Sequence, residues 1–163
     1  MDRKDVYNTV IGYITDNQDK FYRLAYSHIR DREASLDIVQ NAICKALEKY
    51  GDIRNIDSIN SWFYRVLVNE VYTYANKHKR EISVADEDIP VGVYHEKAFE
   101  KDDSINDAIN RLPEKLKTII ILRFFEDMTL EEISKITKTN LNTVKTRLYS
   151  ALSKLKIYYE EAE

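Results

Sequence analysis

The chain has 163 residues, a net charge of −3, and only three glycines and two prolines. Tight turns and phosphate-binding loops need glycine repeatedly, so this composition excludes a many-stranded β-sandwich or barrel and a glycine-rich nucleotide site. A single cysteine, Cys44, excludes an internal disulfide, and no secretory signal or membrane-spanning run is present, so we expect an all-α, cytoplasmic protein without direct membrane insertion.

The first part of the chain predicts a bundle of three or four helices. Apolar residues keep helical spacing from Val6 to Ile14 and again from Phe21 to Ile29. After a break at residues 31–33, the helical spacing returns between Val39 and Tyr50. Gly51 follows directly and is a suitable left-handed helix terminator.

A further amphipathic run begins after Ser58 or Ser61 and interleaves aromatic rings with cations. Rings stack on unpaired bases at roughly 1–3 kcal/mol each while cations hold the backbone, so the pattern is typical of binding to single-stranded or melted DNA. The alternative is that the rings belong to the core, and Trp62, Phe63 and Tyr74 do fall in the apolar period. The better surface candidates are Tyr64, Arg65, Tyr72, Lys79 and Arg80.

The middle of the chain is acidic. Residues 81–110 contain 2 basic and 9 acidic residues, for a net charge of −7, whereas residues 1–80 and 111–163 each carry +2. This segment contains Pro90 and Gly92 and has no sustained apolar period, so it predicts a flexible linker. We therefore expect two domains, at residues 1–80 and 111–163.

The sequence of the second domain predicts a helix-turn-helix. Leu112-Pro113-Glu114 predicts a helix start, and the residues to Phe124 a helix buried on more than one side. Thr129 and Glu132 form a capping-box pattern that opens a short helix. Asn140 then suits the N-cap of the last helix. Two helices joined by a short turn fit a helix-turn-helix, with a plain helical hairpin as the alternative.

The last helix is basic in a chain that is acidic overall. Residues 134–159 contain six basic and no acidic residues. In a helix-turn-helix the second helix lies in the DNA major groove, and Arg147 can bind a guanine edge or clamp a phosphate. The alternative is that these basic residues form only a solvent-exposed helix face and do not bind DNA. The polar positions expected on the exposed side are Asn142, Thr143, Lys145, Thr146, Arg147 and Tyr149.

Three motifs in this order resemble the bacterial extracytoplasmic-function (ECF) sigma factors of RNA polymerase over nearly the whole chain. Asp37-Ile-Val-Gln-Asn41 resembles their region 2.2, and Ser61-Trp-Phe-Tyr-Arg-Val-Leu-Val-Asn69 resembles regions 2.3 and 2.4. Arg111-Leu-Pro-Glu-Lys-Leu, Glu131-Glu-Ile-Ser and Thr143-Val-Lys-Thr-Arg-Leu148 resemble region 4.

The resemblance implies a function. A sigma region 2 bundle (1–80) would bind the β′ clamp helices of core RNA polymerase and read and melt the minus-10 promoter element. A region 4 helix-turn-helix (111–163) would read the minus-35 element, with the β flap as its polymerase partner. The implied polymerase contacts are Asp37, Gln40 and Asn41; the implied minus-10 contacts are Trp62, Arg65, Asn69, Tyr72, Lys77, Lys79 and Arg80; the implied minus-35 contacts are Asn142, Thr143, Lys145, Thr146 and Arg147.

The resemblance also implies a regulatory partner, and four residues of this chain depart from the family pattern. An anti-sigma factor is an expected partner and can hold such a protein at the membrane. Thr73 and Asn76 depart from the family pattern, so the base preference at minus-10 does not carry over. Lys138 and Asn142 stand where the family's turn often has glycine. Lysine in a left-handed turn costs on the order of 1 kcal/mol.

No catalytic function, metal or cofactor is expected. His28, His78, His95 and Cys44 are far apart in sequence, no metal-binding or phosphate-loop motif occurs, and each histidine reads as a surface or helix residue. The alternative function is a stand-alone helix-turn-helix regulator whose N-terminal bundle senses a ligand or dimerises. A bundle that senses a ligand does not need a helix that interleaves aromatic and basic side chains, so this helix argues against the alternative. A structural helical adaptor leaves the acid-free last helix unexplained.

Overall fold

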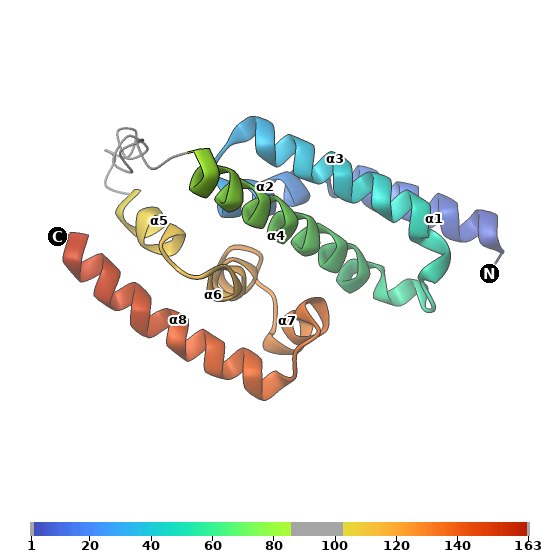
Figure 1. The fold of residues 1–163 in the computed structure, drawn as a ribbon. Coiled ribbons are helices and arrows are strands. Elements are labelled where there is room, and N and C mark those ends of the chain that lie inside the picture. The colour runs from blue at the N-terminus through green and yellow to red at the C-terminus, as the bar shows by residue number, and fades with distance from the viewer. Residues whose placement is uncertain (1, 86–102, 163) are drawn as a thin grey trace.

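The computed structural model describes residues 2–85 and 103–162, and within them it is helical, with no strand (Figure 1). An N-terminal bundle (residues 2–85) and a C-terminal domain (residues 103–162) make up the fold, which confirms the all-α prediction. The bundle contains α1 (Arg3–Asp16), α2 (Gln18–Ile29), α3 (Arg32–Lys49) and α4 (Ile59–Ala85), with short 3-10 turns η1 (Tyr50–Asp52) and η2 (Ile56–Ser58) between α3 and α4.

Helices α1 and α3 of the bundle begin at side-chain caps. The carboxylate of Asp2 accepts a hydrogen bond from the Lys4 amide at 3.0 Å, and that of Asp31 accepts one from the Ala34 amide at 3.1 Å. Each cap satisfies an amide that has no partner in the first helical turn. Inside the bundle, Phe21 of α2 stacks on Phe63 of α4 with ring centroids 4.2 Å apart.

Gly51 does not end a helix in the left-handed conformation, so that prediction is wrong. The preceding residue, Tyr50, stays right-handed at φ −58°, and the chain tightens into η1 instead. Among the described residues, the left-handed positions belong to Arg30, Asp127 and Lys138, none of them glycine.

The C-terminal domain contains α5 (Asp103–Asn110), α6 (Glu114–Ile120), the π-helical turn η4 (Ile121–Phe125), α7 (Leu130–Thr137) and α8 (Leu141–Ala162). Helices α5 and α6 both pack on α8. The small core between these three helices consists of Ala108, Ile109, Leu112, Ile120, Ala151 and Leu155.

The helix-turn-helix is formed by α7 and α8 as predicted. Thr129 and Glu132 make the full capping box, with two hydrogen bonds of 3.1 Å. Lys138 ends α7 in the left-handed conformation at φ 53° and ψ 41°. The side chain of Asn140 accepts a hydrogen bond from the Thr143 amide at 2.8 Å and caps α8.

Two expectations for this domain are wrong. Phe124 is 51% exposed, because the π-helical turn, closed by a bond from the Glu126 amide to the Ile121 carbonyl, rotates the following side chains out of the α-helical period. Asn142 lies inside α8 with a helical backbone and not in the turn.

The helices reach into the segment expected to be the linker. Helix α4 continues to Ala85, and α5 occupies residues 103–110 and packs on α8. The expectations for Pro90, Gly92 and His95 fall outside the described residues.

One hydrophobic core passes through both halves of the chain. Ile119, Leu122 and Ile133 of the C-terminal domain belong to the same buried cluster as Phe63 and Leu67 of the bundle. Helix α7 packs on α4 (Figure 1). The π-helical turn η4 packs on α2. The two domains are therefore docked on each other.

Candidate polymerase and nucleic-acid interface

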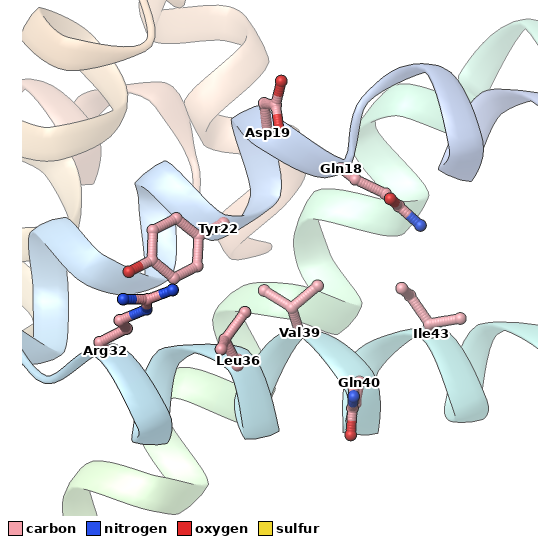
Figure 2. Close-up of a pocket in the computed structure, with 8 residues that line it drawn as sticks. All are labelled: Gln18, Asp19, Tyr22, Arg32, Leu36, Val39, Gln40 and Ile43. Carbon is pink, nitrogen blue, oxygen red and sulfur yellow. The ribbon is translucent and has the colours of Figure 1, made fainter.

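A groove of about 760 Å³ runs between α2 and α3 of the bundle. Figure 2 shows Leu36, Val39 and Ile43 on the α3 side of the groove, with Tyr22 of α2 opposite. Leu36 is 45% exposed. The groove combines an apolar floor with polar rims from Gln18, Asp19, Arg32 and Gln40.

The three residues expected to contact polymerase are all exposed on α3. Gln40 lines the groove just described. Asp37 and Asn41 line a second hollow of about 350 Å³ between α3 and α4, which also holds Lys77. The structure thus brings expected polymerase contacts and an expected minus-10 contact to one hollow.

Four of the residues expected to contact the minus-10 element are spaced along α4 at three- and four-residue intervals: Trp62, Arg65, Asn69 and Tyr72. Such spacing puts them on one face of the helix. Asn69 is exposed, whereas the other three are half-buried. Farther along α4, the side chains of Lys77 and Lys79 are exposed, and that of Arg80 lies outside the described residues.

The C-terminal domain covers part of this face. The Arg65 guanidinium donates a hydrogen bond of 2.6 Å to the backbone carbonyl of Lys135 in α7. The Tyr72 hydroxyl donates one of 2.7 Å to Thr118 Oγ1 in α6. Trp62 and Arg65 line a small hollow together with Lys135.

Tyr64 is 3% exposed, so its prediction as a surface residue is wrong. Its hydroxyl faces Glu126 Oε1 at 3.4 Å, and Glu126 also binds Arg23 Nε and Nη2 at 3.0 and 3.3 Å. Burial, with the nearby Glu126 charge, raises the pKa of Tyr64. The helical period alone predicted one buried face of α4, and the docked domain buries a second one.

A buried polar cluster joins α2, α4 and α6 at the domain boundary. His28 Nε2 lies 3.1 Å from Thr118 Oγ1, and His28 Nδ1 lies 3.4 Å from Glu114 Oε2. Lys117 Nζ donates to the His28 carbonyl at 3.2 Å and lies 3.6 Å from Glu114 Oε1. Tyr72 completes the cluster through its bond to Thr118.

Burial shifts the pKa values of the groups in this cluster. It lowers the pKa of both His28 and Lys117 and raises that of Tyr72, since each charged form is poorly solvated there. Burial also acts to raise the pKa of Glu114, but hydrogen bonding to His28 and the charge of Lys117 lower it overall. Sequence reasoning missed this cluster, because His28 and Thr118 are 90 residues apart.

The start of α8 carries the residues expected at the minus-35 element. Asn142, Lys145 and Thr146 are exposed, and Thr143 and Arg147 are half-buried. Arg147 lies close enough to Tyr72 for its charge to favour ionisation of that hydroxyl, although burial dominates. Tyr149, also expected on the exposed side, is 67% exposed.

The described residues contain no group of three or more His, Cys, Asp or Glu side chains placed to hold a metal ion. Within the same residues, no helix is both long enough and apolar enough to cross a membrane.

The fold and these surfaces define a two-domain helical protein that ends in a helix-turn-helix of the DNA-binding kind. The family model for Sigma-70 region 2 matches residues 13–81, and that for Sigma-70 region 4 matches residues 102–155. The chain belongs to the sigma-70 family, in its ECF group, and is a transcription initiation factor that directs RNA polymerase to promoters.

Relatives cover most of the chain. RNA polymerase sigma factor SigV of Bacillus subtilis (strain 168) is 46% identical over 148 residues, covering 91% of this chain and 89% of SigV. ECF RNA polymerase sigma factor SigW of the same organism is 27% identical over 150 residues, covering 81% of this chain and 79% of SigW. Sigma factor RpoE of Bartonella quintana, solved in complex with the anti-sigma factor NepR, has the same fold, with a TM-score of 0.73 at 20% identity, covering 91% of this chain and 95% of RpoE.

Proposed function

We propose that the exposed side of α3 binds core RNA polymerase. Asp37, Gln40 and Asn41 are exposed on one helix, beside a groove with the apolar side chains of Leu36 and Val39. Apolar pockets rimmed by polar side chains are typical of the central part of a protein interface. By resemblance, the β′ clamp helices occupy this surface and the β flap contacts the C-terminal domain.

The α4 face melts and reads the minus-10 element in this proposal, and this face is the observation that carries it. Trp62 and Tyr72 supply ring faces, Asn69 supplies an amide, and the exposed Lys77 and Lys79 follow on the same helix. Stacking rings combined with cations suit unpaired bases and their phosphates. Arg80 joins this set by its place in the sequence.

The first two turns of α8 read the minus-35 element in the major groove. Asn142, Lys145 and Thr146 are exposed there, and the Asn140 cap fixes where the helix begins. Thr143 and Arg147 complete the set. The basic, acid-free stretch from residue 134 to residue 159 provides the attraction to phosphates.

The finer division of the chain belongs to the same proposal. Residues 1–80 act as region 2, 111–163 as region 4, and 81–110 as an acidic linker, in a cytoplasmic protein. An anti-sigma factor serves as regulatory partner. The fold shared with RpoE, which was solved bound to the anti-sigma factor NepR, supports this partner.

The test is gel filtration of the full chain with core RNA polymerase, followed by transcription in vitro from promoters mapped after overexpression. We expect co-elution and specific initiation, and loss of co-elution when Asp37, Gln40 and Asn41 are all replaced by alanine. The matched control is Glu48→Ala, an exposed change on the same helix. If the protein fails to co-elute but alone footprints a palindromic duplex, it is a stand-alone regulator.

A further inference from the structure

The contacts between the two domains use the same α4 atoms that the proposed minus-10 function needs. The Arg65 guanidinium is bound to the Lys135 carbonyl, and the Tyr72 hydroxyl is bound to Thr118. Trp62 is half-buried beside Lys135. A DNA strand that stacked on these rings and placed a phosphate at Arg65 would occupy the space that α6 and α7 fill.

We propose that the C-terminal domain acts as an intramolecular clasp, which competes with the minus-10 strand for the α4 face and is closed by the Arg23–Glu126 ion pair. The inference rests on the proposed function for the identity of the DNA, but the clasp itself rests on the contacts between the domains. DNA binding at α4 then requires the C-terminal domain to leave the bundle.

The clasp has the features of a specific interface. Its apolar part is continuous with the main core, where Ile121, Leu122 and Ile136 are at most 2% exposed. Its polar part is the cluster around His28 and Thr118, in which Thr118 Oγ1 lies 3.1 Å from His28 Nε2 and accepts a hydrogen bond from the Tyr72 hydroxyl. Polar groups that are paired only in one arrangement select that arrangement over other compact ones.

The Arg23–Glu126 pair is an accessible point at which to open the clasp. The Glu126 side chain is only 2% exposed, whereas that of Arg23 is 53% exposed. A buried carboxylate depends on its partner, so a carboxylate at position 23 destabilises the docked arrangement. Undocking frees both groups to reach water, so the same change costs little in the open form. Neither residue belongs to the proposed promoter-binding set.

The experiment measures the distance between the domains in the free, full chain by double electron–electron resonance. One spin label is attached to the exposed native Cys44 on α3 and the other to Ser153→Cys, which is exposed on α8. The variants are Arg23→Glu, Glu126→Arg and the two combined, which restores opposite charges. The matched control is Arg111→Glu, which breaks the exposed Arg111–Glu161 pair inside the C-terminal domain. Circular dichroism confirms that each variant is helical.

We expect one short, narrow distance in the wild type, the Arg111→Glu control and the charge-swapped double variant. Each single reversal should give a longer, broader distribution. A long, broad distribution in the wild type, or a short distance in both single variants, would overturn the proposal.

The second readout is the affinity for a labelled single-stranded oligonucleotide that carries the non-template strand upstream of a mapped start site. Opening should raise this affinity by about tenfold or more, because a binding-competent state that is rarely populated weakens the apparent affinity in proportion. The single charge reversals could lengthen the distance between the spin labels without raising the affinity for the oligonucleotide. In that case the clasp covers no DNA site, and the proposal is overturned. Failure of the proposed function appears separately, as absent co-elution with core polymerase in every variant.

Discussion

His28 shows how a single side chain depends on packing that its own segment does not encode. Helical spacing placed it on α2, but the sequence did not predict its burial, because Glu114, Lys117 and Thr118 come from a helix nearly 90 residues later. Asp37, Gln40 and Asn41 were implied by the family resemblance, and no distant segment is needed to account for their exposure. Their exposure follows from the helical period of α3 alone.

The buried imidazole makes stability depend on pH. Burial lowers the pKa of His28 below its ordinary value of 6.5 in the folded chain, so the unfolded chain takes up a proton first as the pH falls. The free energy of unfolding should therefore decrease between about pH 7.5 and 5.5, by up to roughly 1.4 kcal/mol per pH unit. Urea unfolding at several pH values measures the slope. His28→Gln should flatten it, and equal slopes in the two proteins would contradict the prediction.

Substitution of Arg147 tests whether this residue contributes to recognition of the minus-35 element. Arg147→Ala should weaken promoter use by roughly 1–3 kcal/mol if the guanidinium is bidentate to a guanine. Transcription in vitro is compared on promoters with an intact and a scrambled minus-35 element, and the loss should occur only on the intact one. Lys156→Ala, exposed farther along α8, is the matched control. Equal transcription by wild type and Arg147→Ala on the intact promoter would remove this role.

At the scale of elements, the helix caps and the helical spacing of apolar residues were predictable from the sequence, whereas irregular backbone was not. The capping box of α7 and the Asn140 cap follow from short-range side-chain chemistry. The π-helical turn at residues 121–125 has no comparable sequence signal, so Phe124 was assigned to the core although it is exposed. Gly51 was assigned a left-handed conformation that Arg30 and Lys138 adopt instead.

Lys138 gives a prediction for the turn of the helix-turn-helix. Its left-handed backbone at φ 53° is strained for lysine, so Lys138→Gly should stabilise the chain by about 1 kcal/mol. The matched control is Lys135→Gly, exposed in α7, which should destabilise by roughly 0.5–1 kcal/mol. Urea unfolding of the three proteins gives both values. A loss of stability in both variants would show that the lysine conformation carries no strain.

At the scale of the whole molecule, the acidic middle segment predicted two domains but not how they dock. Docking depends on complementary surfaces such as Arg23 with Glu126 and Tyr72 with Thr118, and each pair is separated by more than forty residues. The second buried face of α4 is the clearest consequence. Tyr64 and Tyr72 were both expected on the surface, and the C-terminal domain covers one and half-covers the other.

The central claim is that the α4 face melts and reads the minus-10 element. Permanganate reactivity of promoter thymines, in complexes with core RNA polymerase, tests it most directly, because permanganate modifies unpaired thymines. The test variant combines Asn69→Ala with Lys79→Ala, both exposed on α4, and Glu48→Ala on α3 is the control. We predict reactive minus-10 thymines with wild type and control, and their loss in the test variant while it still co-elutes with polymerase. Undiminished thymine reactivity in that variant would contradict the claim.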